Sequence, residues 1–281
     1  MKEGFIKSNY HIHTNYCDGH DPASDMIDAA IQKGFESVGV LCHSFYPFSS
    51  DWHIPVHEHA AFFAEMKCLK EKFTSIKLYT GVEADFVRGM CTPDFSHFKD
   101  FNPDYIIGSV HYIEGKDGLF TVDGPEAEIL DGIKNHFGGS SKKAVQEYFY
   151  LERLMLEKND FTILGHPDLV RKHNDSLSLF NENDCWYKKE LKLLAKKIAS
   201  SGICCEINTG AMSRGFTKLP YPSPYFLELL YEAKVPVTVS TDAHSCENID
   251  FWYDNALEYI KKAGYTETVY LKDGKYEFQK I

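Results

Sequence analysis

Histidine and carboxylate side chains recur in this sequence at the ends of apolar, β-branched runs. His11 and His13 stand two residues apart, as do Asp242 and His244, and this spacing places both members of a pair on the same side of a strand. Residues of the same kinds end or occupy other apolar runs, namely His43, Glu83, His111, His166 and Glu206. Imidazole and carboxylate groups without a thiolate suit zinc, manganese or iron, so the pattern predicts a centre that binds such ions.

The chemistry expected of such a centre is hydrolysis of a phosphate ester. A carboxylate such as Glu83 can bridge two divalent ions, which turn water into hydroxide and neutralise the oxygens of a phosphoryl group. We expect two or three divalent ions (zinc, manganese or iron) as cofactors. Such ions would make the pocket positive although the formal net charge of the chain is −11. The expected partner is therefore a small phosphate monoester substrate.

The elements that must bring these residues together are the strands of an α/β barrel. Apolar runs bounded by turn residues predict seven strands, near residues 8–14, 37–43, 76–86, 105–113, 161–169, 203–210 and 235–244. Helical patterns lie between them, and this alternation is typical of a parallel sheet covered by helices. Seven such units favour a barrel over an open sheet, and no eighth strand is visible. The carboxyl ends of the strands then meet at one mouth, where active sites lie.

The helices are predicted from amphipathic stretches and from their end signals. Ser24 is expected to cap the first helix, and Gly34 is expected to end it. Further helices are expected near residues 57–73, 142–158, 188–200 and 224–233.

The rest of the chain is expected to form one long loop and one hairpin. Residues 115–141 are rich in Gly and charge and predict a loop near the mouth. Residues 267–279 predict a β-hairpin about Asp273 and Gly274 that covers the bottom or the edge of the barrel. We expect a single domain over residues 1–281, because no repeat, linker or low-complexity segment is visible.

The composition restricts the location and the partners of the protein. The first residues, MKEGFIKSNY, form no apolar segment, and no run is long and apolar enough for a membrane span, so we expect a cytoplasmic protein that does not bind a membrane. Its eight cysteines include no CxxC pair and are expected to be reduced, with Cys42, Cys204 and Cys205 in the core. The acidic balance argues against binding to long nucleic acid, which requires clustered Lys and Arg.

Six segments, in order from residue 11 to residue 244, read HIHTNYCDG, LCHS, GVEADF, SVHY, GHPDL and STDAH. They resemble the successive motifs of the PHP (polymerase and histidinol phosphatase) family. The chain length, the segment CEINTG and the lack of an appended polymerase are similar to the histidinol-phosphate phosphatase branch. This resemblance implies a distorted seven-unit barrel with a trinuclear metal site. It also implies hydrolysis of L-histidinol phosphate to L-histidinol and phosphate, in histidine biosynthesis.

The resemblance also implies a ligand set for each ion. The first ion would be held by His11, His13, Glu83 and Asp242. The second would be held by Glu83, His111 and His166, and the third by Asp18, His43 and His244. Cys42 departs from the family pattern, which usually has an acidic residue before the histidine of this motif. His20 competes with Asp18 for the third site, and we expect Asp18 because CDG matches the family's SDG spacing.

Fixed positive groups are expected to hold the phosphate. Only four arginines occur in the chain, and three of them, Arg88, Arg171 and Arg214, follow predicted strand ends. A guanidinium can hold two phosphate oxygens at once, and we expect Arg171 and Arg214 to do so, with Arg88 as a further candidate. Asp168 and Glu206 are expected beside the metals, where they would suit the amine and imidazole of histidinol phosphate.

The leaving alcohol needs a proton, which Asp242, His244 or a metal-bound water is expected to supply. Seven other histidines are expected to have no role in the site: His20, His53, His57, His59, His97, His136 and His173. Three of these, His53, His57 and His59, are expected to face solvent at a helix start. Four aromatic residues after the second strand either wall the pocket or pack in the core: Phe45, Tyr46, Phe48 and Trp52.

Three other functions remain open at this stage. The same site would also suit a nucleotide or nucleic-acid phosphoesterase of the PHP family. A metal-binding module without catalysis is a second alternative, although an intact ligand set argues against it. A metal-dependent amidohydrolase is a third, but no middle strand offers the bridging Lys that such a site normally uses. The native metals and the oligomeric state do not follow from the sequence.

Overall fold

The computed structural model describes residues 4–44, 50–116, 118–157 and 160–281. All seven predicted strands are present, most of them shorter than predicted: β1 (Ser8–Asn9), β2 (Ser37–Val40), β3 (Lys77–Asp85), β4 (Tyr105–Ser109), β7 (Ile163–Leu164), β8 (Cys204–Asn208) and β9 (Val237–Ser240). They form one sheet in the order β1-β2-β3-β4-β7-β8-β9, and every neighbouring pair is parallel.

The two edge strands of this sheet approach each other and nearly close a barrel. Beyond β1 and β9 the chain forms a parallel bridge between Ile12 and Ala243. The backbone N–H of His13 donates to Ala243 O at 2.9 Å, and the N–H of Ala243 donates to His11 O at 3.2 Å. The closure therefore lies at the residues that carry the candidate ligands, and the predicted seven-stranded barrel is confirmed.

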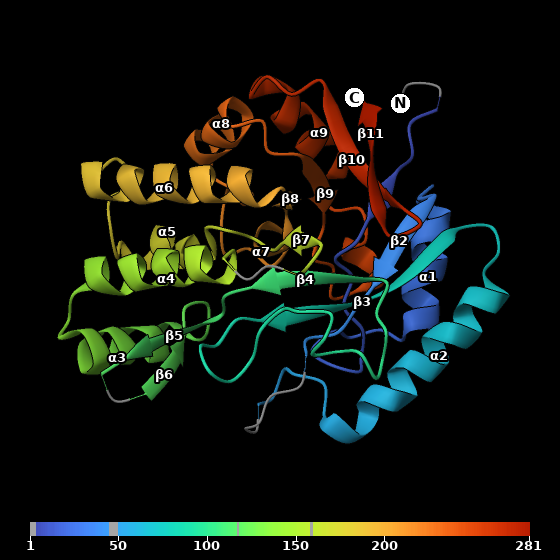
Figure 1. Cartoon of the computed structure of the whole chain (residues 1–281), viewed down its shortest axis with the longest axis horizontal. Coiled ribbons are helices and arrows are strands. Elements are labelled where there is room, and N and C mark those ends of the chain that lie inside the picture. The colour runs from blue at the N-terminus through green and yellow to red at the C-terminus, as the bar shows by residue number, and fades with distance from the viewer. Residues whose placement is uncertain (1–3, 45–49, 117, 158–159) are drawn as a thin grey trace.

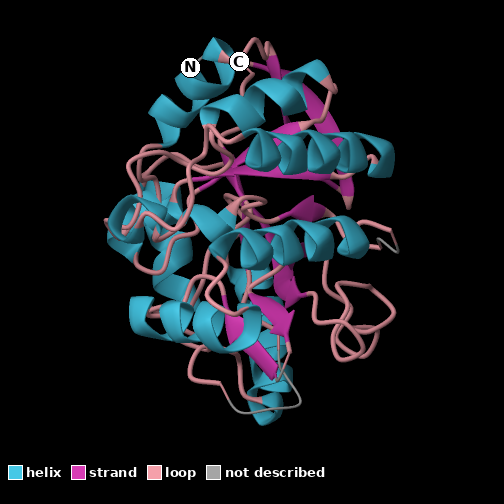
Figure 2. Ribbon diagram, turned by 90° about the vertical axis from the view of Figure 1, so that its left-hand side faces the viewer, coloured by secondary structure: helices cyan, strands magenta, loops and turns pink. Residues whose placement is uncertain are grey.

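Helices lie outside the strands (Figures 1 and 2). Five of them match the sequence-based predictions: α1 (Ala23–Gln32), α2 (His59–Lys72), α4 (Ser141–Met155), α6 (Cys185–Ser201) and α8 (Pro224–Glu232). The short helices α5 (Asn174–Leu177) and α7 (Gly210–Ser213) follow strand ends, and α9 (Tyr253–Lys262) follows β9. None of the helices in the described residues is both long enough and apolar enough to cross a membrane.

Two predictions about local structure, the cap of the first helix and the loop over residues 115–141, were wrong. Helix α1 begins at Ala23 after Pro22, so Ser24 lies in its first turn and caps nothing. Residues 115–141 do not form a loop, because they contain β6 (Gly118–Thr121) and α3 (Glu126–Phe137), and β6 pairs with β5 (Tyr112–Gly115). The glycines that suggested a loop serve instead as close contacts and as helix ends. Gly132, for example, faces the Phe120 ring, where a Cβ would come within 2.4 Å.

Alternate residues of β3 contribute side chains to both ends of the barrel. Tyr79, Gly81, Glu83 and Asp85 share one face of the strand and are ordered from its amino end to its carboxyl end. At the amino end Tyr79 belongs to a small apolar cluster with Tyr10, Leu41, Tyr105, Ile107, Ile163 and Leu271. A Cβ on Gly81 would come within 2.2 Å of the Tyr105 ring, so glycine leaves the space that this ring fills.

The predicted C-terminal hairpin closes the amino end of the barrel. Strands β10 (Glu267–Lys272) and β11 (Lys275–Lys280) pair antiparallel about Asp273 and Gly274, which both have positive φ. The N–H of Leu271 donates to the Tyr10 hydroxyl at 2.8 Å, and the Tyr79 hydroxyl donates to Leu271 O at 2.9 Å. The hairpin therefore satisfies the polar ends of the tyrosines that fill this end of the barrel.

Candidate metal centre

The carboxyl ends of six strands carry the predicted ligands to one place. His11 and His13 follow β1, His43 follows β2 and His111 follows β4; the others are Glu83 in β3, His166 after β7, and Asp242 and His244 after β9. Most of these side chains are buried, and His11, His13 and Glu83 have no exposed surface. A parallel barrel directs all of its strand ends to one mouth, which is why residues so far apart in sequence meet here.

The first group of ligand atoms consists of acceptors that converge. His11 donates from Nδ1 to Glu206 Oε2 at 2.9 Å, so the Nε2 of a neutral ring carries a lone pair. That atom lies 3.0 Å from His13 Nε2 and 3.1 Å from Glu83 Oε2. Asp242 Oδ1 lies 3.3 Å from His13 Nε2. Acceptors this close need a proton or a cation between them, and this donor set suits a divalent metal ion.

Glu83 connects this group to a second one. Its Oε2 faces His11 and also lies 3.1 Å from His43 Nδ1. Its Oε1 lies 3.0 Å from His166 Nε2 and 3.5 Å from His111 Nε2. The two oxygens of one buried carboxylate therefore face different histidines, which is the arrangement of a bridging ligand.

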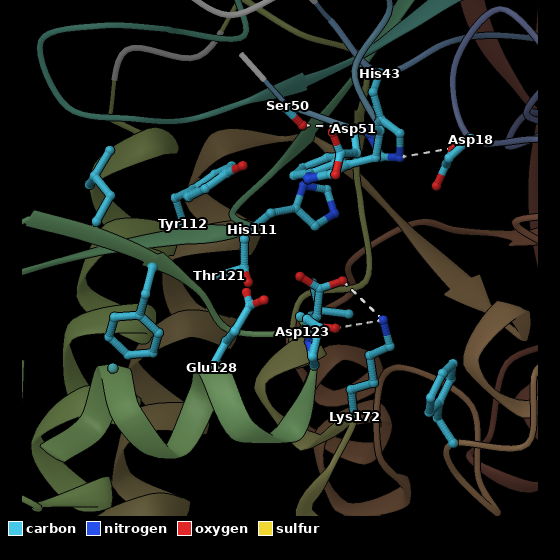
Figure 3. Close-up of a pocket in the computed structure, with 18 of the residues that line it drawn as sticks. Asp18, His43, Ser50, Asp51, His111, Tyr112, Thr121, Asp123, Glu128 and Lys172 are labelled. Carbon is cyan, nitrogen blue, oxygen red and sulfur yellow. Dashed lines mark hydrogen bonds and ion pairs between the residues drawn. The ribbon is translucent and has the colours of Figure 1, made fainter. Parts of the chain in front are cut away.

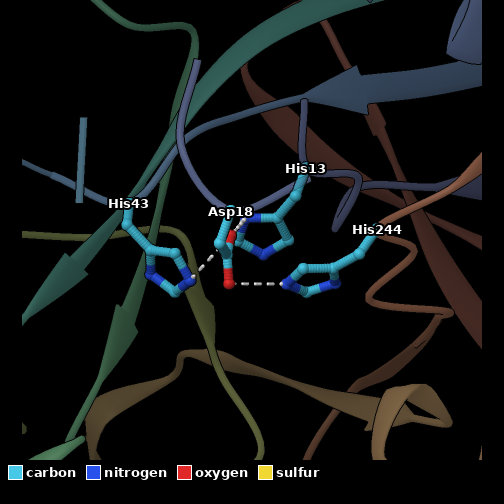
Figure 4. Close-up of side chains that lie close together, drawn as sticks. All are labelled: His13, Asp18, His43 and His244. Atoms are coloured by element: carbon cyan, nitrogen blue, oxygen red, sulfur yellow. Dashed lines mark hydrogen bonds and ion pairs between the residues drawn. The ribbon is translucent and has the colours of Figure 1, made fainter. Parts of the chain in front are cut away.

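The third group surrounds Asp18, which lies between three histidines (Figure 4). Asp18 Oδ2 lies 3.0 Å from His244 Nε2, while Oδ1 lies 3.5 Å from His13 Nδ1 and 3.7 Å from His43 Nε2. His13 and His43 thus each face two groups, whereas the resemblance assigned each of them to one. His20 lines the outer cavity, and the structure brings Asp18 to the three histidines instead.

Opposite charges hold one another ionised in this centre. Burial opposes the charge on His11, but Glu206 and Glu83 raise the pKa of its imidazole well above the usual value. Burial also opposes ionisation of Glu83, yet His11 holds its pKa well below the usual value. Burial lowers the pKa of His43 to about 4, so this ring is neutral at pH 7 and its lone pair is available to a metal.

The backbone at Asp242 is held in an uncommon conformation. Asp242 has φ 48°, in the left-handed region, at the end of the last barrel strand. A Cβ on Gly210 would come within 2.5 Å of Asp242 Oδ2, so glycine at this position lets the carboxylate approach. Such strain, found at a ligand position, is typical of a functional site.

Two acidic residues expected to contact substrate are used elsewhere. Glu206 has no exposed surface, and besides His11 it accepts from the N–H of His166 at 2.9 Å and from Asn208 Nδ2 at 2.8 Å. Asp168 is equally buried and accepts from the N–H of Ser223 at 2.8 Å. Glu206 therefore contacts the candidate ligand His11, while Asp168 is buried against the backbone of Ser223, and a contact of either residue with the substrate stays a prediction.

The three candidate arginines also differ in their surroundings. Arg171 is buried, with Nε 3.1 Å from Glu182 Oε2, and Arg88 donates from Nε to Glu114 Oε2 at 3.0 Å. Neither belongs to the cavity lining found among the described residues, and their assignment to the substrate stays a prediction. Arg214 does line the cavity, where its Nη1 lies 2.7 Å from His244 Nδ1.

A cavity of about 910 Å³ opens from the ligand groups (Figure 3). Its outer wall comes from β5, β6 and α3, and the last two lie in the segment expected to be a loop. This wall is acidic and aromatic, and it includes Tyr112, Phe120, Asp123, Glu128, Asp131 and His136. Lys172 also lines the cavity and donates from Nζ to Asp123 O at 2.8 Å. The sequence analysis missed Lys172, although its position, six residues after His166 at a strand end, was a usable signal.

The structure also locates several residues for which the sequence predicted no role or left two roles open. Trp52 lines the cavity, while Phe45, Tyr46 and Phe48 lie outside the described residues. His57 is exposed, as expected, but His53 and His59 are buried, so the prediction that they face solvent was wrong. Cys42, Cys204 and Cys205 are buried, as predicted.

The chain belongs to the PHP domain family, whose model matches residues 9–210. A probable histidinol-phosphatase of Schizosaccharomyces pombe is 26% identical over 266 residues, which cover 89% of this chain and 84% of the relative. The histidinol-phosphatase of Bacillus subtilis is 23% identical over 271 residues, which cover 90% of this chain and 98% of the relative. A histidinol phosphate phosphatase of Lactococcus lactis, solved with zinc, L-histidinol and phosphate, has the same fold, with a TM-score of 0.71 and 22% identity. The alignment covers 96% of this chain and 98% of that protein.

Proposed function

We propose that this protein is a metal-dependent phosphomonoesterase that hydrolyses L-histidinol phosphate to L-histidinol and phosphate. The observation that carries the proposal is the placement of Glu83, whose two oxygens face separate groups of buried histidines at the mouth of a PHP-family barrel. The names of the curated relatives, which align over most of the chain, support this substrate.

The nine ligand candidates are proposed to hold two or three divalent ions (zinc, manganese or iron), and they are His11, His13, Asp18, His43, Glu83, His111, His166, Asp242 and His244. When bound, such ions activate water and neutralise the oxygens of a phosphoryl group. The protein contributes the fixed positions of the ligands, because most of their rings and carboxylates are buried before any substrate arrives.

Two cations of this chain are proposed to bind the phosphate. Arg214 lies beside His244 and Asp242. Burial opposes the charge of its guanidinium, but Asp242 raises its pKa, so Arg214 stays charged. Lys172 reaches the cavity from the segment after β7 and is paired with Asp123. A guanidinium and an ammonium that both line the cavity would orient a phosphate monoester at the metal centre.

The acidic wall is proposed to receive the organic part of the substrate. Asp123, Glu128 and Asp131 line the cavity together with the aromatic rings of Tyr112 and Phe120. Histidinol phosphate carries an ammonium group and an imidazole, and carboxylates and aromatic faces both attract such cations. The cavity therefore combines metal ligands and cations suited to phosphate with acidic groups suited to an amine, and the two sets meet where Lys172 pairs with Asp123.

The leaving alcohol is proposed to take its proton from Asp242 or His244. Both line the cavity at the end of β9, and His244 Nδ1 lies 2.9 Å from Asp242 O. Arg214 fixes both groups, since its Nη1 lies 2.7 Å from His244 Nδ1 and its Nη2 lies 3.3 Å from Asp242 Oδ2. This arrangement keeps both candidate proton donors beside the arginine that is proposed to bind the phosphate.

The proposal is tested by phosphate release from purified, manganese- or zinc-loaded protein. Histidinol phosphate is compared with nucleoside monophosphates, an aryl phosphate whose organic part carries no charge, and a short oligonucleotide. We expect a strong preference for histidinol phosphate. A double variant, Glu128→Gln with Asp131→Asn, should raise KM for histidinol phosphate and leave KM for the aryl phosphate unchanged. A preference for nucleotides or oligonucleotides would instead favour another reaction of the family and contradict the proposed substrate.

A further inference from the structure

Asp85 is a buried carboxylate that belongs to none of the three ligand groups. It stands two residues after Glu83 on β3, so both side chains share one face of the strand, and neither residue has exposed surface. A buried carboxylate is costly unless it is paired and hydrogen-bonded. The hydrogen-bond partners of Asp85 therefore show how its buried charge is stabilised.

One oxygen of Asp85 fixes the ring of His111. Asp85 Oδ1 accepts from His111 Nδ1 at 2.7 Å and from the backbone N–H of His111 at 3.1 Å. A carboxylate only accepts, so the ring proton of His111 sits on Nδ1. The lone pair is then on Nε2, which faces Glu83 Oε1 at 3.5 Å. Asp85 thus selects the tautomer in which His111 can bind a metal on the side of the bridging carboxylate.

The other oxygen of Asp85 reaches the wall of the cavity through His53. Asp85 Oδ2 lies 3.3 Å from His53 Nε2, and His53 is only 7% exposed. The His53 ring packs on Trp52 at 3.7 Å between centroids, and Trp52 packs edge-on against His43 at 4.6 Å. Trp52 lines the cavity. A continuous set of contacts therefore joins the cavity wall, Asp85 and the ligand His111.

We propose that Asp85 is a positioning residue for the metal centre, holding His111 in its metal-binding tautomer, and that His53 links this support to the cavity wall at Trp52. The inference rests on the proposed function only in requiring that the mouth of the barrel bind metal ions. Asp85 contacts the Nδ1 of His111 in the same way that Glu206 contacts the Nδ1 of His11. Loss of such an outer partner typically weakens metal binding by about 10- to 100-fold.

The test compares the variant Asp85→Asn with the matched control Asp168→Asn. Asp168 also stands two residues after a candidate ligand, His166, and is equally buried, but it pairs with Arg171 and Ser223 rather than with a ligand ring. Metal content is counted by elemental analysis, affinity is measured by competition with a chelator, and the visible spectrum of the cobalt-loaded protein reports the coordination. Asp85→Asn should weaken binding of at least one ion by about 10- to 100-fold and alter the cobalt spectrum, and Asp168→Asn should do neither.

Variants at His53 supply a second, milder test. His53→Leu removes the donor to Asp85 Oδ2, whereas His53→Gln retains an N–H group. We expect a several-fold loss of metal affinity in the first, and affinity closer to wild type in the second.

Three results would overturn the inference. The first is wild-type affinity and spectrum in Asp85→Asn, and the second is an equal loss in Asp168→Asn, which would reduce the effect to general disturbance of the core. Both would leave the proposed phosphatase function standing. The third is a wild-type protein that binds no divalent metal, which would refute the proposed function and this inference together.

Discussion

The two ends of the barrel use the same strands for opposite purposes. On β3, Tyr79 packs in the apolar cluster at the amino end, and Glu83 reaches the ligand groups at the carboxyl end. On β4, Tyr105 fills the amino end, while Ser109 donates to Glu83 Oε1 at 2.8 Å. Only a few residues separate a packed aromatic layer from a concentration of buried charges.

This difference shows where the stability and the chemistry of the protein reside. At the closed end, tyrosine rings are buried and their hydroxyls are hydrogen-bonded, as when Tyr105 donates to Tyr10 O at 2.7 Å. At the mouth, acceptor atoms lie within hydrogen-bond distance of one another and depend on protons or cations. We therefore expect changes at the mouth to affect metal binding and turnover, and changes at the closed end to affect unfolding.

The largest effect is expected at the bridging carboxylate. Glu83→Gln removes the charge shared by two ligand groups and should lower kcat by at least about 10³-fold. Metal content, measured by elemental analysis, should fall with it. The control Glu190→Gln alters a buried carboxylate that pairs with Arg153 on the outside of the barrel, and it should leave metal content unchanged. Full activity in Glu83→Gln would refute the bridging role.

A smaller effect is expected at the phosphate-binding cation. Arg214→Ala should mainly raise KM for histidinol phosphate, by about 10- to 100-fold, because a charged hydrogen bond contributes about 1.5–3 kcal/mol. Steady-state kinetics with varied substrate measure this change. The matched variant Arg88→Ala removes an arginine that pairs with Glu114 away from the cavity, and its KM should equal that of wild type. Equal effects of the two substitutions would contradict the assignment.

The closed end should respond in the opposite way. Gly81→Ala places a methyl group against the Tyr105 ring and should lower the free energy of unfolding by about 1–3 kcal/mol. Metal content and kcat should remain at wild-type values, because the ligand groups lie at the other end. Urea unfolding and elemental analysis on the same preparation measure both. Loss of metal without loss of stability would contradict the assignment of stability to the closed end and of metal binding to the mouth.

The smallest effect concerns Glu152, a buried carboxyl on α4 outside both ends. Burial raises its pKa well above the usual value of 4.5, against the opposing effect of the Tyr148 hydroxyl. The folded chain therefore keeps a proton that the unfolded chain loses, so stability falls as pH rises above 4.5 towards the raised pKa. One such group contributes a slope of about 1.4 kcal/mol per pH unit within that window.

Glu152→Gln cannot ionise and should remove this slope. Urea unfolding of metal-free wild type and variant at several pH values from about 5 to 8 covers the range in which such a carboxyl changes its charge. The variant should lose less stability than the wild type as pH rises. Identical pH dependence in the two proteins would show that Glu152 is ionised when folded.

The sequence was sufficient to predict the barrel and the convergence of most candidate ligands, because both follow from local patterns. Each strand is an apolar run, and most candidate ligands stand at a carboxyl end, so parallel topology brings His11, Glu83 and Asp242 together. Asp85 was within reach of the same reasoning, because it shares a strand face with Glu83.

Other features depend on how side chains pack, which spacing does not reveal. Arg171 follows a strand end as Arg214 follows another, yet Glu182 holds Arg171 inside the protein. His53 precedes a helix, where an exposed side chain is common, but Asp85 and Trp52 bury it. The acidic cavity wall was missed because the Gly-rich, charged composition of its segment is typical of loops.

The most direct test of the central claim is phosphate release from histidinol phosphate by chelator-treated protein, before and after divalent metal is restored. Bound metal is counted in the same samples. We predict no turnover without metal, and recovery of turnover in proportion to the ions bound, up to two or three per chain. Turnover that persists after complete removal of metal would contradict the account, as would a fully metal-loaded protein that releases no phosphate.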